Sequence, residues 1–179
     1  MKKLIFISLL FSILSLSVSA QKPTKAEKAA QLEQEFQQTR QLIESNHFQF
    51  ELNRVYPQDG QDLSRFNPRG KFVITDSVAK GTLPFFGRAY SLPYGEGGGI
   101  EFEKAKIEKE SLKVINKRKK HYIEYKFNVR NHNDVFNFHV EVYGNGKCSV
   151  NVTSNNRASI SYAGKLTPIP DDKKEIYLK

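Results

Sequence analysis

Apolar and polar residues alternate along much of this chain after His47, which is the pattern of strands with one buried face. The alternation is clear over residues 48–52, where Phe and Leu are separated by Gln and Glu. Shorter alternating runs at 72–74 and 100–102 indicate two more strands, the first of them after an Asn-Pro-Arg-Gly turn at 67–70. We therefore expect three half-buried strands in this part of the chain.

The C-terminal half contains apolar alternations long enough to test hairpin registers, because a slip of one residue would turn every apolar side chain outward. Strands at 123–129 and 136–142 match one to one if 131–134 is a four-residue turn. The next strand, 148–152, stays in register only with a three-residue loop at 144–146. This predicts a type I turn with a bulge at Gly146 rather than a two-residue Asn-Gly turn.

The same register continues in both directions along the chain. In this register Leu112 lies opposite Tyr125 and Val114 lies opposite Ile123, with a basic turn between the two strands. Val152 likewise lies opposite Ile160, with residues 155–157 between them. Five consecutive strands thus form an antiparallel meander whose apolar side chains, from Leu112 onward, are expected to face one dry interior.

Residues 24–46 are predicted to form the helix of this chain. Thr24 and Glu27 have the spacing of a capping box. The apolar residues at helical spacing are Ala29, Leu32, Phe36, Leu42 and Ile43. Because this stripe is narrow and the polar face carries both signs of charge, we expect the helix to pack on the protein's own core rather than on a membrane.

One helix and about eight strands define a mainly β protein with an N-terminal helix. The leading architecture is an antiparallel up-and-down β-barrel or a curled half-barrel, since closure removes exposed edges. A flat sheet covered by the helix is the alternative. We expect one domain over 21–179, with the helix at 24–46, the barrel at 47–166 and a C-terminal tail.

The first twenty residues have the pattern of a secretory signal peptide, with two lysines, an apolar run and small residues before Gln21. Cleavage near Ala20 is expected to give an exported protein, periplasmic or released to the medium. The run is short for a membrane span, and no cysteine follows the cleavage point to carry a lipid anchor. We expect neither a membrane span nor a lipid anchor.

The chain is basic, with 28 Lys and Arg against 19 Asp and Glu. Removal of Lys2 and Lys3 with the signal peptide leaves a formal charge of +7, which suits anionic partners. The charge is spread, however, and its one dense run, 117–120, has the length of a solvated turn. Together with export, this argues against nucleic acid as a partner.

The segment LPFFGRAYSLPYGEGGGIEF, residues 83–102, is the best candidate for recognition. Its glycines are followed by a strand pattern rather than a helix, so they fit a turn and not a phosphate loop. Prolines at both ends limit the flexibility of the aromatic part. The rings either belong to the core or form a pocket rim. The candidate ligand-binding residues in this segment are Phe85, Phe86, Arg88, Tyr90 and Tyr94.

Tyr125, Tyr162 and Arg157 complete the set of candidate ligand-binding residues. Both tyrosines fall on the predicted inward face, where a buried hydroxyl requires a partner, so they either bond to the barrel wall or line a cavity. Arg157 is placed to reach a carboxylate ligand at the barrel mouth or to make an ion pair within the protein.

Catalytic and metal chemistry has little support in the sequence. The four histidines show no metal-ligand spacing, and the single cysteine, Cys148, falls on the inward face without a partner base. No serine lies in a nucleophile-elbow context. We therefore expect no cofactor, no metal and no enzymatic activity.

The runs LPFFGRAY (83–90), PYGEGGGIEF (93–102) and NRASISYAG (156–164) resemble those of the domain of unknown function family 4251, small exported proteins of Bacteroidetes-type bacteria. The resemblance covers most of the mature chain, including the entry helix and the NHFQF run (46–50). It implies a lipocalin-like β-barrel and assigns neither an activity nor catalytic residues.

Two functions fit these observations. The first is a non-catalytic binding protein that holds a small amphipathic or apolar ligand inside the barrel, since the inward face carries two tyrosines. The second is a protein-interaction or inhibitor-like module that uses segment 83–94 or the convex sheet face. A cavity lined by Tyr125 and Tyr162 would favour the first, and a filled interior the second.

Overall fold

The structure, a computed structural model, describes residues 24–91, 98–117, 120–131 and 134–170. Within these ranges the chain forms one α-helix, a short 3-10 helix and eight strands. In chain order the elements are α2 (Lys25–Glu44), β1 (His47–Pro57), η1 (Ser64–Phe66), β2 (Gly70–Thr75), β3 (Val78–Leu83), β4 (Ile100–Lys117), β5 (Lys120–Asn131), β6 (Asp134–Tyr143), β7 (Lys147–Thr153) and β8 (Ile160–Pro168). The signal-peptide pattern at 1–20 and the tail from 171 lie outside the described residues.

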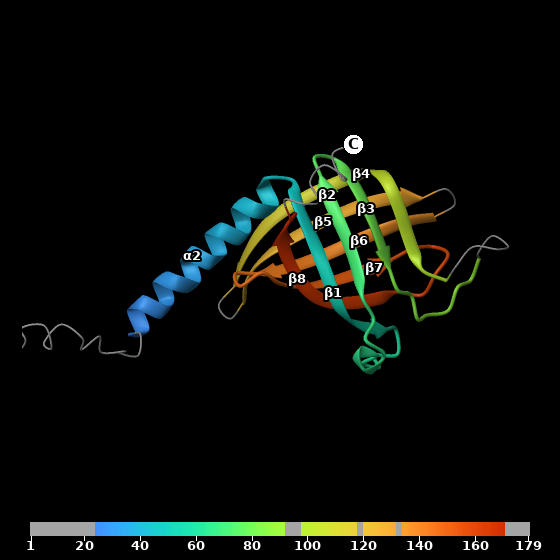
Figure 1. The fold of residues 1–179 in the computed structure, drawn as a ribbon, viewed down its shortest axis with the longest axis horizontal. Helices are drawn as coiled ribbons and strands as arrows, with labels where there is room; N and C mark the ends of the chain where they lie inside the picture. The colour runs from blue at the N-terminus through green and yellow to red at the C-terminus, as the bar shows by residue number, and fades with distance from the viewer. Residues whose placement is uncertain (1–23, 92–97, 118–119, 132–133, 171–179) are drawn as a thin grey trace, which may run out of the picture. The chain divides into compact units, whose positions relative to one another are not determined.

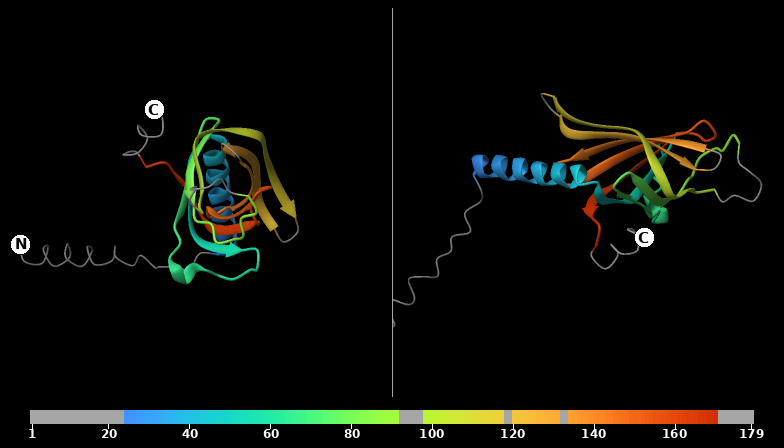
Figure 2. Two further views of the ribbon diagram at one scale, coloured as in Figure 1. Left: turned by 90° about the vertical axis from the view of Figure 1, so that its right-hand side faces the viewer. Right: turned by 90° about the horizontal axis from the view of Figure 1, so that it is seen from above.

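The strands form a closed antiparallel barrel in which each strand pairs with the next and β8 returns to β1 (Figures 1 and 2). The expected up-and-down barrel is thus confirmed, and the sheet is neither a half-barrel nor flat. The closing pair runs from Phe48 opposite Pro168 to Pro57 opposite Ile160. Closure pairs both terminal strands and so removes the two edges that an open sheet would expose.

The hairpin registers predicted for the C-terminal half are all confirmed. Phe127 opposes Phe138, and Val150 opposes Val140 on one side and Tyr162 on the other. Gly146 adopts a φ of 75°, and its N–H donates a 2.8 Å hydrogen bond to the carbonyl of Tyr143. The loop therefore has the three residues that keep the apolar faces together.

Strand β3 was not expected from the sequence, because its inward positions are mostly small. Ala79 and Leu83 are fully buried, and Gly81 lies between them on the same face. A Cβ atom on Gly81 would overlap the Cβ atom of Phe72 on β2. The close approach of the β2 backbone at Lys71 and Phe72 therefore excludes a side chain at Gly81, which weakens the alternation in the sequence.

Strand β4 is one continuous strand, whereas the sequence suggested separate strands at 100–102 and 112–114. The register of β4 is irregular on both sides, and Lys104 and Lys109 have positive φ values of 47° and 52°. Each irregularity adds a residue, so the inward positions shift out of strict alternation. The expected number of strands was correct because this merger compensates for the missed β3.

Leu112 and Val114 show that the prediction of a dry interior was wrong at one end of β4. Their register is as predicted, opposite Tyr125 and Ile123, but they are 37% and 43% exposed. Pairing between β3 and β4 ends at Lys106. The β4–β5 hairpin therefore extends past its β3 neighbour, and no opposite wall covers these two side chains.

Helix α2 begins with the predicted capping box. The N–H of Glu27 donates to the hydroxyl of Thr24, and the Glu27 carboxylate accepts from the Thr24 N–H. The helix ends at Glu44 rather than at residue 46, because Asn46 takes a left-handed φ of 54° and turns the chain into β1. No helix in the described part of the chain is long and apolar enough to cross a membrane.

The last turns of α2 pack on one end of the barrel. The ring of Phe36 stacks on His121 of β5 with 3.7 Å between ring centroids. Thr39 donates a 2.7 Å hydrogen bond to the carbonyl of Gly144 in the β6–β7 turn. Phe36, Thr39 and Ile43 are buried, whereas Leu32 of the predicted apolar stripe is 62% exposed, so the expected packing on the core is confirmed only for the last turns of the helix.

Candidate functional site

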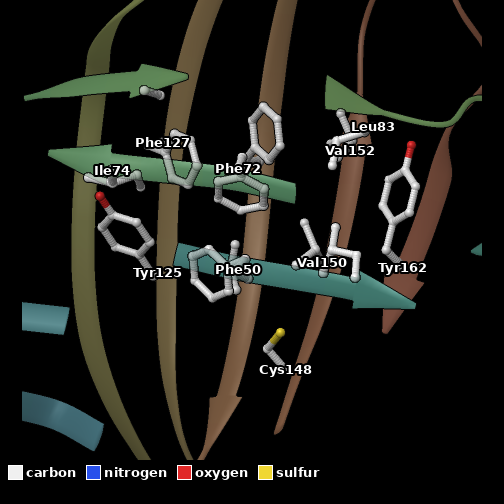
Figure 3. Close-up of a cluster of buried hydrophobic side chains, with 14 of the residues drawn as sticks. Phe50, Phe72, Ile74, Leu83, Tyr125, Phe127, Cys148, Val150, Val152 and Tyr162 are labelled. Atoms are coloured by element: carbon white, nitrogen blue, oxygen red, sulfur yellow. The ribbon is translucent and has the colours of Figure 1, made fainter. Parts of the chain in front are cut away.

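Buried aromatic rings pack against one another inside the barrel. Phe127 and Phe138 stack with ring centroids 4.7 Å apart, and Phe72 packs against both. Figure 3 shows Phe72 and Phe127 among the buried side chains. Phe50 and Phe102 extend the same cluster. All five rings are buried, so they contact one another rather than a solvent-filled space.

The two inward tyrosines use their hydroxyl groups within the protein. Tyr125 donates a 2.9 Å hydrogen bond to the carboxylate of Glu110, and Tyr162 donates a 2.9 Å hydrogen bond to the carbonyl of Pro84. Burial raises the pKa of both phenols well above the ordinary value, so both are neutral at physiological pH. Of the two alternatives for these tyrosines, the structure shows bonding to the wall.

The chain from Pro84 to Ser91 lies against the β7–β8 connection. The N–H of Ala158 donates to the carbonyl of Arg88, and the N–H of Tyr90 donates to the carbonyl of Asn156. Ala89 and Arg157 form an antiparallel bridge between these two hydrogen bonds. Two parts of the sequence about seventy residues apart are therefore joined at one end of the barrel, and the backbone of segment 84–91 is fixed there.

Arg157 is buried beneath this segment, with 7% exposure. It donates a 2.9 Å hydrogen bond to the carbonyl of Gly98, and its Nε atom lies 3.7 Å from the Oδ2 atom of Asp134. Its guanidinium also lies over the ring of Phe85, 5.3 Å from the ring centroid. Arg157 thus connects the start of β4, the start of β6 and segment 84–91 through contacts within the protein.

Phe85 and Phe86 are adjacent in sequence but have different surroundings. Phe85 is half-buried and packs against the core, and a Cβ atom on Gly87 would lie 2.6 Å from its ring. Gly87 therefore lets the backbone cross directly over Phe85. Phe86 points outward and is 43% exposed.

Phe86, Arg88 and Tyr90 line one surface hollow of about 540 Å³, which we call the aromatic hollow. Tyr90 is 62% exposed, and Arg88 is exposed as well. The irregular chain around the bend at Gly87 presents these three side chains to the same hollow. The full lining is Pro57, Gln58, Asp59, Phe86, Gly87, Arg88, Tyr90 and Ala158.

The structure divides the predicted site residues into groups. Phe86, Arg88 and Tyr90 are together in the aromatic hollow, while Phe85 and Arg157 contact each other and are not part of its lining. Tyr162 contacts the same segment through Pro84, and Tyr125 bonds elsewhere, to Glu110 of β4. Tyr94 lies outside the described residues.

Sequence reasoning missed the opposite wall of the aromatic hollow, residues 57–59, and the partner of Arg157, Asp134. The Pro-Gln-Asp-Gly run signals a turn at the end of β1. Nothing in that run indicates which other loop it faces, because the pairing of β1 with β8 decides its position.

Two other surface hollows have less recognition chemistry. One of about 440 Å³ lies over β2, β3 and β4, and one of its two lysines, Lys80, forms an ion pair with Glu103 at 2.7 Å. Another of about 440 Å³ lies between α2 and the β6–β7 turn, with Leu42 and Leu166 in its lining. Neither lining combines an exposed aromatic ring with a nearby charged side chain that is free of ion pairs among the described residues, as the aromatic hollow does.

Reactive groups are sparse in the described part of the chain. Cys148 is buried, and burial raises the pKa of its thiol to about 12. Its thiolate, the reactive form, is therefore scarce near neutral pH. Among the described residues no three His, Cys, Asp or Glu side chains are grouped so that they could hold a metal ion.

A comparison with protein-family models places these features in a family. The model described as "Domain of unknown function (DUF4251)" matches residues 30–166. The chain belongs to the DUF4251 family. The match begins within α2 and ends within β8, so it includes β1 to β7, most of β8 and both segments that meet beside the aromatic hollow. A comparison with curated proteins found no match.

A solved structure supports the fold of this DUF4251 chain. It is the 1.95 Å crystal structure of a DUF4251 family protein from Bacteroides eggerthii DSM 20697. The two structures align with a TM-score of 0.55 and 16% sequence identity, over 83% of this chain and 96% of the other. At this identity the comparison shows a shared fold.

The sequence runs that resemble the family meet in the structure of this DUF4251 protein. Residues 83–90 and 156–164 are the two runs joined by the Arg88–Ala158 and Tyr90–Asn156 backbone hydrogen bonds. The side chain of Tyr162 adds a third connection, to Pro84. These two runs therefore specify one structural unit, whose outer surface is part of the aromatic hollow.

Proposed function

We propose that this DUF4251 protein is a non-catalytic binding protein that is exported and recognises a small amphipathic molecule or a protein partner at the aromatic hollow. The observation that carries the proposal is the exposure of Phe86 and Tyr90 on a backbone that the 156–158 loop holds in place. Exposed rings on a fixed backbone lose little conformational entropy on binding. Aromatic residues and arginine are also the residues most enriched at binding hot spots.

The contacts within the barrel favour this surface over the interior as the ligand site. The inward rings pack against one another, and the hydroxyls of Tyr125 and Tyr162 already have partners. A ligand among these rings would have to displace well-packed side chains, which is costly. We therefore favour the aromatic hollow over the barrel interior.

Native mass spectrometry of protein purified from its own host tests the proposal. Wild type is compared with a Phe86→Ser/Tyr90→Ser variant and with a matched control, Val78→Ser/Tyr143→Ser, which removes two exposed apolar side chains elsewhere. We expect wild type and the control to retain the same bound molecule and the hollow variant to lose it. Equal retention by the hollow variant, or no bound molecule on wild type after incubation with host envelope extract, would contradict the proposal.

A further inference from the structure

The aromatic hollow is lined by one positive and one negative side chain that do not neutralise each other. Arg88 comes from segment 84–91, and Asp59 comes from the turn after β1. In the described part of the chain neither residue makes an ion pair, with the other or with a third side chain. Asp59 accepts one hydrogen bond, from the N–H of Gln61 at 3.1 Å. Both charges are therefore available to a ligand.

The rings of Phe86 and Tyr90 lie on either side of Arg88 along the segment, so the hollow combines apolar faces with two opposite charges. A phosphate or another polyanion would meet the Asp59 carboxylate as well as Arg88, and like charges disfavour such a ligand. A neutral lipid would cover Arg88 and Asp59 without pairing them, which costs free energy. The complementary ligand carries both charges and an apolar body.

We propose that the aromatic hollow binds a short peptide with free termini, with its carboxylate on Arg88, its ammonium group near Asp59 and an apolar side chain against Phe86 and Tyr90. An arginine guanidinium matches a carboxylate with two parallel hydrogen bonds. The volume of about 540 Å³ lies in the range of small-ligand pockets and fits a peptide of a few residues. This inference rests on the proposed function, because it names the ligand class of the same hollow.

The test uses the tripeptide Gly-Phe-Gly in three forms: free, N-acetylated and C-amidated. Titrations are followed by amide chemical shifts in ¹H–¹⁵N NMR spectra, which give both the location and the Kd. We expect the free peptide to shift the amide signals of residues 58–59 and 86–90. Each blocked form should bind roughly threefold to fivefold more weakly, which is the effect of a solvent-exposed ion pair.

Variants assign each charge to its partner. The Arg88→Gln variant lacks the partner of the peptide carboxylate, so it should bind the free and amidated peptides equally. The Asp59→Asn variant lacks the partner of the peptide ammonium group, so it should bind the free and acetylated peptides equally. Arg130→Gln and Asp76→Asn, exposed residues that do not line the hollow, are the matched controls and should keep the wild-type preference.

Each outcome decides the inference. Selective loss of one end-group preference in each variant would support it. Equal binding of all three peptides to wild type, shifts located away from the hollow, or no binding up to about 10 mM would overturn it, because even weak specific ligands bind at millimolar concentration. The proposed function would survive those results if the host-purified protein still carried a molecule that depends on Phe86 and Tyr90.

Discussion

The hydroxyl of Tyr162, on the last strand of the barrel, donates a 2.9 Å hydrogen bond to the carbonyl of Pro84, which directly follows β3. Tyr162 is fully buried and 78 residues from Pro84 in sequence. A carbonyl at the end of a strand has no ladder partner of its own, so this bond meets the hydrogen-bonding requirement of Pro84. The position of segment 84–91 therefore depends on β8.

Replacement of Tyr162 with phenylalanine tests this dependence. The variant keeps the ring but leaves the Pro84 carbonyl without its donor, so the free energy of unfolding should fall by about 1–3 kcal/mol. Urea unfolding measures the change. Tyr125→Phe is the control: its hydroxyl bonds to Glu110, an exposed carboxylate that water can solvate, so its loss should be smaller. Equal losses in the two variants would contradict this account.

Arg157 and Asp134 form a pair in which both side chains are almost fully buried. Arg157→Met should lower the free energy of unfolding by roughly 3–5 kcal/mol, because it leaves the Asp134 carboxylate buried without a positive neighbour. The double variant Arg157→Met/Asp134→Asn should lose less than the sum of the single variants. Thermal and urea unfolding of wild type, the two single variants Arg157→Met and Asp134→Asn, and the double variant gives the coupling energy. Strictly additive losses would show that the two groups do not interact.

Gly164 lies opposite Leu52, where β8 pairs with β1 to close the barrel. A Cβ atom there would overlap the carbonyl oxygen of Glu51, and a second backbone atom, the Cα of Leu52, would lie 2.8 Å away. Gly164→Ala should therefore destabilise the protein by about 3 kcal/mol or more, at or above the upper end of the usual cost of overpacking. Gly98→Ala, where a Cβ atom would meet nothing within 4 Å, should leave the melting temperature almost unchanged.

The buried thiol of Cys148 is expected to lower the free energy of unfolding at alkaline pH. Burial raises the pKa of its thiol in the folded protein from 9.0 to about 12. Between these values the unfolded chain loses this proton and the folded chain keeps it, so unfolding is favoured as the pH rises, by up to about 1.4 kcal/mol per pH unit. Urea unfolding between about pH 8 and 11 should show a shallower decline in Cys148→Ala, since the buried tyrosines contribute equally to both proteins. Parallel declines would contradict the prediction.

Much of the barrel could be predicted because its C-terminal strands obey one simple rule. From Ile123 to Tyr162 the apolar side chains face a shared interior, and only one set of loop lengths keeps them there. The rule failed where the backbone departs from strict alternation. The irregularities near Lys104 and Lys109 concealed the continuity of β4, and the small residues of β3 concealed a strand.

The candidate site was predicted less completely, for a different physical reason. The aromatic segment was found from its own composition, which marks Phe86, Arg88 and Tyr90 without any partner. Asp59 lines the hollow together with the aromatic segment, and Asp134 pairs with Arg157, and both arrangements exist only once β1 and β6 have taken their places in the barrel. No local pattern identifies such residues.

The pairing of β1 with β8 has a consequence for the order of events during synthesis. His47 leaves the ribosome long before Pro168, yet Phe48 requires Pro168 opposite it to complete the wall. A nascent chain can form the hairpins between neighbouring strands, whose contacts are local, but the ring is incomplete until the last strand is made. The ring can therefore close only after β8 has been made, and a truncation before β8 leaves two open edges that other chains can join.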